Sequence, residues 1–411
     1  MAAERIDKLY EDAVASGLLP GVSVIAGNKN GNILYRKSLG VSSLKEGRNA
    51  PPFNEDTVCA IASMSKLMTS VAVLRAVEEG KLDLDADIRP AHPEMGKYGI
   101  ITGFNDETKE ATYEPDSTPI TVRMLLNHTS GHEYDWLSPF LGRWRAARGE
   151  IPWSGPRVED KSALPLMFKP GTKWAYGGGH DWAGKAVEVG TGERLEDFMR
   201  TRFWEPLGIE NDITFYPKEN PSIGERLADF ATLNEKGEPP ATDLSQFDIL
   251  FGGTDCLGGG GLFSSAGAYF RFLGAVFRRD PKLLTAASYQ ELFRPQLDAE
   301  GEEALNAYLT CSPIHTQFLC RGIPPGVRKQ WSFGGLVASD GRDGWFSKGT
   351  TFWAGVSSVT WWMDHEAGHF GTALCQILPP MHPPVIALHT EFEKGVWEIS
   401  KGGGTGTKSQ Q

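Results

Sequence analysis

The strand-like segments of this sequence lie near its two ends, and this distribution restricts the possible fold more than any other feature. Residues 21–27 and 33–36 have extended apolar patterns, and Asn28–Gly31 between them is typical of a hairpin turn. Three further strand patterns follow only near the C-terminus, at residues 331–338, 349–363 and 369–378. One antiparallel sheet can contain both sets only if the two ends of the chain meet.

Helical patterns fill much of the remaining chain. Apolar residues recur at helical spacing in six segments, at residues 3–17, 65–79, 121–127, 180–202, 264–278 and 387–399. We therefore predict an α/β (α+β) fold, with an antiparallel sheet flanked by helices and a mainly helical second domain. The predicted parts are a discontinuous sheet domain, a mainly helical domain and a disordered tail, at 1–90 with 320–399, 91–319 and 400–411.

Composition excludes several classes of partner. The formal net charge is -11, which argues against nucleic acid and anionic membranes, because both require a basic face. No apolar run approaches the ~18 residues of a membrane span, and residues 1–21 lack the apolar core of a secretory signal. The cysteines are scattered and odd in number, which is typical of reduced thiols and predicts a cytoplasmic protein: Cys59, Cys256, Cys311, Cys320 and Cys375.

A serine with a lysine three residues later occurs twice, at Ser63 with Lys66 and at Ser42 with Lys45. Only Ser63 precedes an apolar helix pattern, so Ser63 and Lys66 would share its first turn, where the helix dipole favours negative charge. A serine hydroxyl is a weak nucleophile, and an amine in a partly dry site can serve as its base. A helix cap explains Ser63 as well, so the local pattern leaves both interpretations open.

The segment His365–His369 matches the His-Glu-x-x-His zinc signature, which binds a metal only when it lies on a helix. The flanking segments have strand patterns, and a glycine lies inside the supposed helix. We therefore predict a hairpin turn over Asp364–Gly368 and no metal site.

Two other features have simple structural interpretations. The glycine run Gly258–Gly261 is not followed by Gly-Lys-Ser/Thr, so we interpret it as a tight loop against packed backbone rather than a phosphate loop. His128 could act as a general base, but a hydrogen bond to backbone near a turn explains it more simply.

Five segments occur in an order that is typical of one enzyme family: ASMSKLMTS at 62–70, ITVRMLLNHTSG at 120–131, KPGTKWAYGGGHDWAGKAVE at 169–188, GGGGLFSSAGAYFRF at 258–272 and KGTTFWAGVSSVTWWMDHEAG at 348–368. In this order they resemble the serine hydrolases related to class C β-lactamases, which include the family VIII esterases. Segments 174–185 and 347–355 look most like the fungal lovastatin-type acyltransferases (transesterases), which acylate polyketide alcohols.

The resemblance implies a role for each matching residue. Ser63 would be the nucleophile, and Lys66 would take or share its proton. Tyr176 matches the family's motif tyrosine and would relay protons between the leaving and entering groups. The backbone amides of Ser63 and Val356 would form the oxyanion hole.

Two departures from the family pattern affect the expected substrate. Trp353, followed by Ala354 and Gly355, stands where lactamases carry Lys-Thr-Gly, so an anionic ligand would lose a charged partner worth ~1.5–3 kcal/mol. Gly177 and Gly178 follow Tyr176 in place of x-Asn, so an amide side chain is missing. Both changes favour a neutral, bulky, apolar group. The expected substrate-binding residues are Trp353, Ala354, Gly355 and Gly178, with Trp136, Trp144 and Trp153 covering Ser63.

We therefore expect an enzyme that forms an acyl-Ser63 intermediate and needs neither cofactor nor metal. It would pass an acyl group from an ester or thioester to an apolar alcohol of a natural product, as in secondary metabolism. An acyl-carrier protein is an additional candidate donor. The alternatives are a plain carboxylesterase, a lactone or amide hydrolase of the same fold, and a catalytically silent binding protein.

Overall fold

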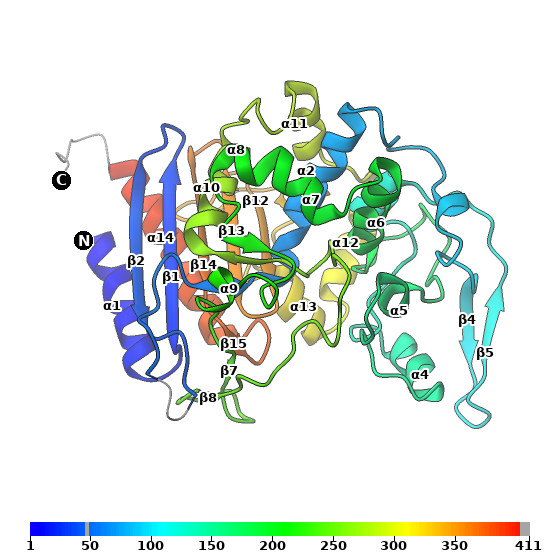
Figure 1. The fold of residues 1–411 in the computed structure, drawn as a ribbon, viewed down its shortest axis with the longest axis horizontal. Coiled ribbons are helices and arrows are strands. Elements are labelled where there is room, and N and C mark those ends of the chain that lie inside the picture. The colour runs from blue at the N-terminus through cyan, green and yellow to red at the C-terminus, as the bar shows by residue number, and fades with distance from the viewer. Residues whose placement is uncertain (46–48, 403–411) are drawn as a thin grey trace.

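The computed structural model describes residues 1–45 and 49–402 (Figure 1). Its main sheet has seven strands in the order β10-β11-β12-β13-β14-β1-β2, and every neighbouring pair is antiparallel. Their bounds are β1 (Gly21–Asn28), β2 (Ile33–Gly40), β10 (Lys329–Ser332), β11 (Gly335–Ala338), β12 (Thr351–Gly355), β13 (Val359–Asp364) and β14 (His369–Leu374). β1 pairs with β14, with Ser23 opposite Leu374, so the two ends of the chain share one sheet as predicted.

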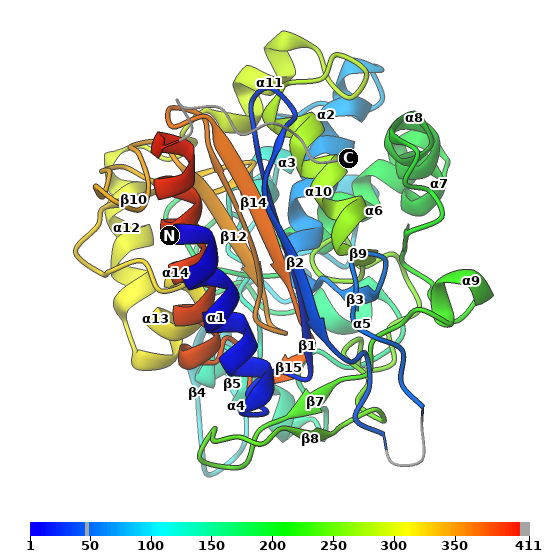
Figure 2. The same cartoon turned by 90° about the vertical axis from the view of Figure 1, so that its left-hand side faces the viewer.

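Helices cover both faces of this sheet (Figure 2). α1 (Ala2–Ala15) and α14 (Pro383–Gly402) lie side by side on one face, and α10 (Ala266–Phe277) packs on the other against β14 and β1. All residues of β13 and β14 are therefore buried, which explains their nearly continuous apolar sequences. The predicted sheet flanked by helices is confirmed.

The segment between β2 and β10 contains most of the helices and, except for β15, the strands of three small sheets. The helices are η1 (Ala62–Met64), α2 (Ser65–Glu78), η2 (Arg89–Ala91), α3 (Val122–Leu126), α4 (Pro139–Ala147), α5 (Val158–Ser162), α6 (Gly179–Thr191), α7 (Leu195–Met199), η3 (Arg200–Trp204), α8 (Glu205–Leu207), α9 (Pro221–Gly224), α11 (Ala286–Phe293), α12 (Ala299–Thr310) and α13 (Pro313–Cys320). The small sheets combine β3 (Val58–Ala60), β9 (Phe263–Ser265) and β6 (Ile213–Thr214); β15 (Ile377–Leu378), β7 (Ala231–Thr232) and β8 (Thr242–Asp243); and β4 (Ile100–Phe104) with β5 (Ala111–Glu114). The division into two domains remains a prediction.

Two predicted elements are interrupted at glycines with positive φ angles, and several other elements were not predicted. The helix expected over 180–202 stops at Gly192, whose φ of +75° ends α6. The strand pattern at 331–338 contains a hairpin, because Gly335 takes a φ of +145° that only glycine adopts readily. The hairpin β4–β5 and helices α4, α11, α12 and α13 were not predicted.

The C-terminal helix also extends beyond its predicted end. α14 reaches Gly402, so the tail does not begin at Ser400 as expected. The hydroxyl of Ser400 donates to the carbonyl of Trp397 at 2.8 Å, and Lys401 Nζ lies 4.9 Å from the Trp397 ring centroid, so both side chains support the last turn. The remainder of the predicted tail, 403–411, lies outside the described residues. None of the helices in the described part of the chain combines the length and apolar character that crossing a bilayer requires.

Candidate active site

Ser63 lies in a single 3₁₀ turn between a short strand and one of the most deeply buried helices. β3 leads into η1 (Ala62–Met64), and α2 begins at Ser65. Ala62 takes a φ of +44°, a left-handed conformation that costs a residue with a side chain about 1–2 kcal/mol. The hydroxyl of Ser65 helps to offset this cost, because it donates to the Ala62 carbonyl at 2.6 Å and accepts from the Leu262 amide at 3.1 Å.

Three of the predicted side chains meet at the Ser63 hydroxyl. Tyr176 donates its phenolic proton to Ser63 Oγ at 2.8 Å, and Lys66 Nζ lies 3.3 Å from the same oxygen. Lys66 Nζ also lies 4.7 Å from the centroid of the Tyr176 ring. The Ser63 side chain is thus held by an amine and a phenol, which is the arrangement of an activated nucleophile rather than of a helix cap.

Burial sets the protonation of these groups. The Lys66 side chain is almost entirely buried, and the loss of water lowers its pKa to about 7, while the Asp181 carboxylate opposes part of this shift. Burial raises the pKa of the Tyr176 phenol, so that group keeps its proton at neutral pH. Near pH 7 a substantial fraction of Lys66 is therefore a neutral amine that can accept a proton, beside a phenol that can donate one.

An apolar cavity of about 250 Å³ opens beside Ser63. Loops and α13 contribute its apolar wall, which includes Trp136, Trp153, Phe247, Ile249, Phe251 and Phe318. This lining offers few hydrogen bonds to a ligand, so it favours a neutral apolar group.

β12 provides one side of a second, narrower hollow next to Ser63. Three expected substrate-binding residues line it, namely Trp353, Ala354 and Gly355. A Cβ atom on Gly355 would lie 2.5 Å from the carbonyl oxygen of Ile61, so glycine allows the end of β12 to approach the turn that carries Ser63. Val356 follows this glycine and lines both hollows together with Ser63. The amides of Ser63 and Val356 remain our proposed oxyanion hole.

Two residues expected to contact substrate lie elsewhere. Gly178 is absent from the described residues that line the two hollows, and a Cβ there would lie 2.4 Å from Ser162 Oγ. Its lack of a side chain allows α6 to pack on α5. Trp144 belongs to a separate apolar cluster beside α4, so the expectation that it covers Ser63 is wrong. Trp136 and Trp153 do line the apolar cavity.

Comparison with known proteins agrees with this geometry. Residues 6–393 match the sequence model of the family described as Beta-lactamase. The chain belongs to the β-lactamase family. It is 33% identical to the lovastatin esterase of Penicillium rubens, over 93% of this chain and 95% of that protein. It is 31% identical to the monacolin J acid methylbutanoyltransferase of Aspergillus terreus, over 95% of each chain.

Solved structures give the same result. A mutant of simvastatin synthase from Aspergillus terreus superposes with a TM-score of 0.88 at 30% sequence identity, covering 98% of this chain and 96% of that one. The β-lactamase-like fold expected from the resemblance is therefore confirmed. This protein is a serine hydrolase or acyltransferase of that family.

Sequence reasoning did not identify three further groups of this β-lactamase-family site. Lys66 Nζ donates to the Gly259 carbonyl at 2.6 Å and to the Tyr134 hydroxyl at 3.2 Å. Asp181 Oδ1 accepts from the Gly259 amide at 2.8 Å, so it holds the residue whose carbonyl binds Lys66. The run Gly258–Gly261 was the sequence feature that could have indicated these groups. A Cβ on Gly259 would lie within 3.0 Å of both the Asp181 carboxylate and the Tyr134 hydroxyl, so only glycine fits between them.

His128 supports the tyrosine rather than reaching the nucleophile. Its ring centroid lies 5.0 Å from that of Tyr176 and 4.9 Å from that of Trp331. Its carbonyl accepts the amide of Ala175 at 3.1 Å, next to the catalytic candidate Tyr176. Burial lowers the pKa of His128, so the imidazole is neutral. These contacts give His128 a structural role, but its ring Nε2 has no hydrogen-bond partner among the described residues, so the predicted hydrogen bond to backbone is not observed at that atom.

The zinc-like motif lies on a hairpin turn, as predicted. β13 ends at Asp364, β14 begins at His369, and the Gly368 amide closes the turn onto the Asp364 carbonyl at 2.8 Å. His365 stacks on Phe277 at 4.6 Å, whereas His369 Nδ1 accepts from a tryptophan. Within residues 1–45 and 49–402, no group of three or more His, Cys, Asp or Glu side chains is arranged to hold a metal ion.

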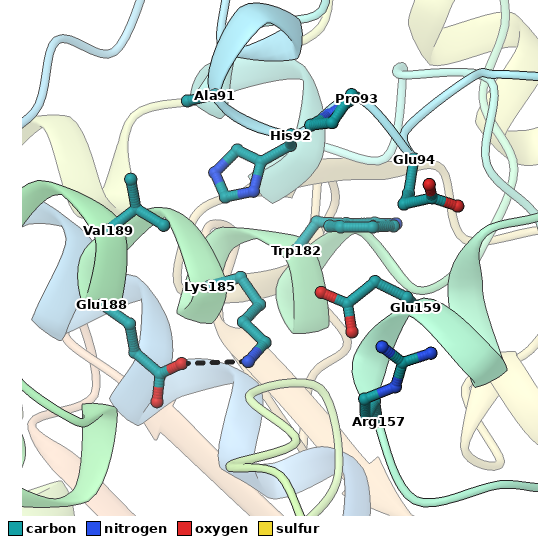
Figure 3. A pocket seen from close by; sticks show the side chains of 10 residues that line it. All are labelled: Ala91, His92, Pro93, Glu94, Arg157, Glu159, Trp182, Lys185, Glu188 and Val189. Carbon is teal, nitrogen blue, oxygen red and sulfur yellow. Dashed lines mark ion pairs between the residues drawn. The ribbon is translucent and has the colours of Figure 1, made fainter.

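A larger hollow of about 550 Å³ lies against α6, away from the residues that surround Ser63 (Figure 3). Charged side chains of both signs line it, including Arg157, Lys185, Glu94, Glu159 and Glu188. Lys185 is paired with Glu188 at 3.3 Å, the contact drawn in Figure 3, and with Asp255 at 3.1 Å. Because these charges compensate one another, and none of the described residues that line this hollow is a serine, threonine or cysteine, we place the active site at the apolar cavity.

Proposed function

We propose that this enzyme transfers an acyl group from an ester or thioester to the hydroxyl group of an apolar natural product, through an acyl-Ser63 intermediate. The observation that carries the proposal is the contact of Ser63 with Lys66 and Tyr176 at the edge of an apolar cavity. One relative is named an esterase and another a methylbutanoyltransferase, and these names describe two outcomes of the same acyl-enzyme chemistry.

In the first half-reaction, neutral Lys66 accepts the proton of Ser63, and Ser63 Oγ attacks the carbonyl carbon of the donor. The amides of Ser63 and Val356 would stabilise the negative charge that develops on the carbonyl oxygen. Tyr176 then donates its proton to the departing oxygen or sulfur as the bond to the acyl carbon breaks. The proton on Lys66 then passes to the phenolate oxygen of Tyr176, so that both groups return to their starting protonation states.

In the second half-reaction, the acceptor alcohol attacks the acyl carbon of acyl-Ser63. The Tyr176 hydroxyl accepts the alcohol's proton as it gives its own proton to neutral Lys66, and Lys66 then protonates Ser63 Oγ as the bond from Ser63 to the acyl carbon breaks. The products are the new ester and the restored serine. An ammonium form of Lys66 has no lone pair to begin this cycle, which is why the lowered pKa matters.

The apolar wall favours transfer over hydrolysis. An acyl-enzyme partitions according to which acceptor is positioned and how well bulk water is excluded. Trp136, Trp153 and Phe318 offer surface to an apolar alcohol but few hydrogen bonds to a water molecule. We include a thioester on an acyl-carrier protein among the proposed donors.

We also propose a cytoplasmic location, because none of the five cysteines forms a disulfide.

Plain ester or lactone hydrolysis is the second candidate, because a relative is named an esterase. The deciding experiment loads the enzyme with a short acyl thioester and then offers a panel of polyketide and terpenoid alcohols. Mass spectrometry should show acyl-Ser63 first and an ester of one of the alcohols afterwards. Release of free acid alone, whatever the alcohol, would identify a hydrolase.

A catalytically silent binding protein is distinguished by a simpler assay. Turnover of p-nitrophenyl butyrate by the wild-type enzyme, together with its loss in Ser63→Ala, excludes this alternative. A chain that binds the ester without cleaving it would refute the acyl-enzyme proposal.

A further inference from the structure

Lys161 is a buried lysine that takes no part in the proposed chemistry. It lies on α5, and its residue is only 1% exposed. Its Nζ donates to the backbone carbonyls of Leu250 at 2.7 Å, Trp153 at 2.8 Å and Phe251 at 3.3 Å. An ammonium group has three N–H donors, and here all three point to carbonyls of two separate loops.

These two loops build much of the wall of the cavity beside Ser63. One loop contributes Trp153, and the other contributes Ile249 and Phe251. The rings of Trp153 and Phe251 meet edge to face at 6.1 Å, and the Gly155 amide donates to the Phe251 carbonyl at 3.2 Å. Lys161 therefore binds both loops at the place where their wall residues contact each other.

The backbone at both wall residues is in an unfavourable conformation. Trp153 has a φ of +52° and Phe251 a φ of +47°, in the left-handed region that residues other than glycine rarely occupy. The carbonyl of each of these residues accepts a hydrogen bond from Lys161. Such conformations persist only where surrounding contacts hold them, and the contacts of Lys161 serve this purpose.

Several charged and aromatic groups surround the Lys161 ammonium. Carboxylates of four residues raise its pKa, one in its own helix and three in the neighbouring α6 and loops: Asp160, Asp181, Asp248 and Asp135. Its Nζ lies 4.6 Å from the Trp153 ring centroid, and Arg145 donates to the Lys161 carbonyl at 3.0 Å. Burial outweighs these effects and lowers the pKa of Lys161 to about 8.

We propose that Lys161 is a positioning residue that fixes the apolar wall and thereby sets the enzyme's preference for substrates with bulky apolar groups. The inference rests on the proposed acyl-enzyme function and deepens it. Lys161 lies behind the wall residues and acts on substrate only through Trp153 and Phe251. A purely structural role would lower activity on all substrates alike, so the preference between substrates distinguishes the two roles.

The test compares wild type with Lys161→Met, which keeps the length and apolar stem of the side chain but removes its donors and charge. The substrates are p-nitrophenyl acetate and p-nitrophenyl octanoate, which share a leaving group and differ only in the apolar chain. We expect kcat/KM for octanoate to fall about tenfold, mainly through KM, and that for acetate to fall less than about threefold. Lys169→Met removes an exposed lysine and should change neither value.

An equal fall for both esters, or no change for either, would overturn the positioning role. If Lys161→Met does not fold, wild type supplies the test through pH. The octanoate-to-acetate ratio of kcat/KM cancels the common chemistry, and it should fall as pH rises through about 8, because the neutral amine has one donor fewer. A ratio that stays constant over this range would overturn the proposal. Failure of wild type to cleave either ester would instead overturn the proposed function and this inference with it.

Discussion

The catalytic centre and the apolar wall beside it are held in place by different means. Ser63 lies on η1, Lys66 lies in the first turn of α2, and Tyr176 lies three residues before α6, so short stretches of chain determine their positions. The wall depends on two irregular loops that are joined by the Lys161 side chain and by the hydrogen bond from the Gly155 amide to the Phe251 carbonyl. The chemistry is thus built on regular structure, whereas substrate preference is built on contacts between distant segments. Changes in the wall can therefore alter specificity without disturbing the nucleophile.

The largest effect should come from the nucleophile itself. Ser63→Ala should lower kcat by about a millionfold, the scale seen when a serine nucleophile is removed. Ser42→Ala is the matched control, because Ser42 belongs to the other Ser-x-x-Lys sequence and lies outside any helix. Its kcat for p-nitrophenyl butyrate should stay near the wild-type value. Comparable losses in both variants would contradict the assignment of Ser63.

Local spacing explains why this part of the site could be predicted. Ser63, Lys66 and the helix that begins beside them are encoded within a few residues, and Tyr176 lies in a segment that resembles the family. The turn over Asp364–Gly368 was likewise readable from its flanking strand patterns. The antiparallel sheet that the two ends of the chain share followed from the positions of the strand patterns.

The remainder of the site depends on long-range packing that no local pattern encodes. Tyr134 reaches Lys66 from 68 residues away along the chain, and Gly259 reaches it from 193. Lys161 was not recognised in the sequence at all, because its acceptors lie on loops as far as 90 residues away. The expectation for Trp144 was wrong for the same reason: an aromatic residue in a loop-rich region can belong to any neighbouring cluster.

The second largest effect should come from the tyrosine. Tyr176→Phe keeps the ring and its packing on Trp353, at 5.2 Å between centroids, and removes only the hydroxyl that donates to Ser63. We expect kcat/KM to fall by about 10²–10⁴, the usual scale of general acid–base catalysis, with an unchanged Tm. Wild-type kinetics in this variant would mean that protons reach Ser63 by another path.

A smaller effect should appear in the pH profile. Lys66 acts as a base only when neutral, so activity should rise as pH increases through about 7, the pKa to which burial lowers this amine. Asp181→Asn retains an acceptor for the Gly259 amide but removes a negative charge that raises the pKa of Lys66. The acid limb of kcat/KM should therefore move to lower pH, by about one unit.

The pH profile of Asp181→Asn also distinguishes an electrostatic role of Asp181 from a structural one. A limb that moves to higher pH, or does not move, would show that Asp181 does not act on Lys66 through its charge. A uniform loss of rate at every pH would indicate that Asp181 matters only for the position of the Gly259 peptide.

The smallest expected effect distinguishes the apolar cavity from the charged hollow on α6. Phe251 and Val189 are both exposed apolar residues, at 41% and 58%, but only Phe251 lines the cavity beside Ser63. Phe251→Ala leaves the carbonyl that Lys161 binds and removes part of the apolar wall, which is worth about 1 kcal/mol of contact with a bulky ligand. We expect kcat/KM for p-nitrophenyl octanoate to fall about fivefold, with acetate nearly unchanged. Val189→Ala should leave both values unchanged, and a loss for octanoate in that variant but not in Phe251→Ala would show that the charged hollow, rather than the wall, contacts the apolar chain.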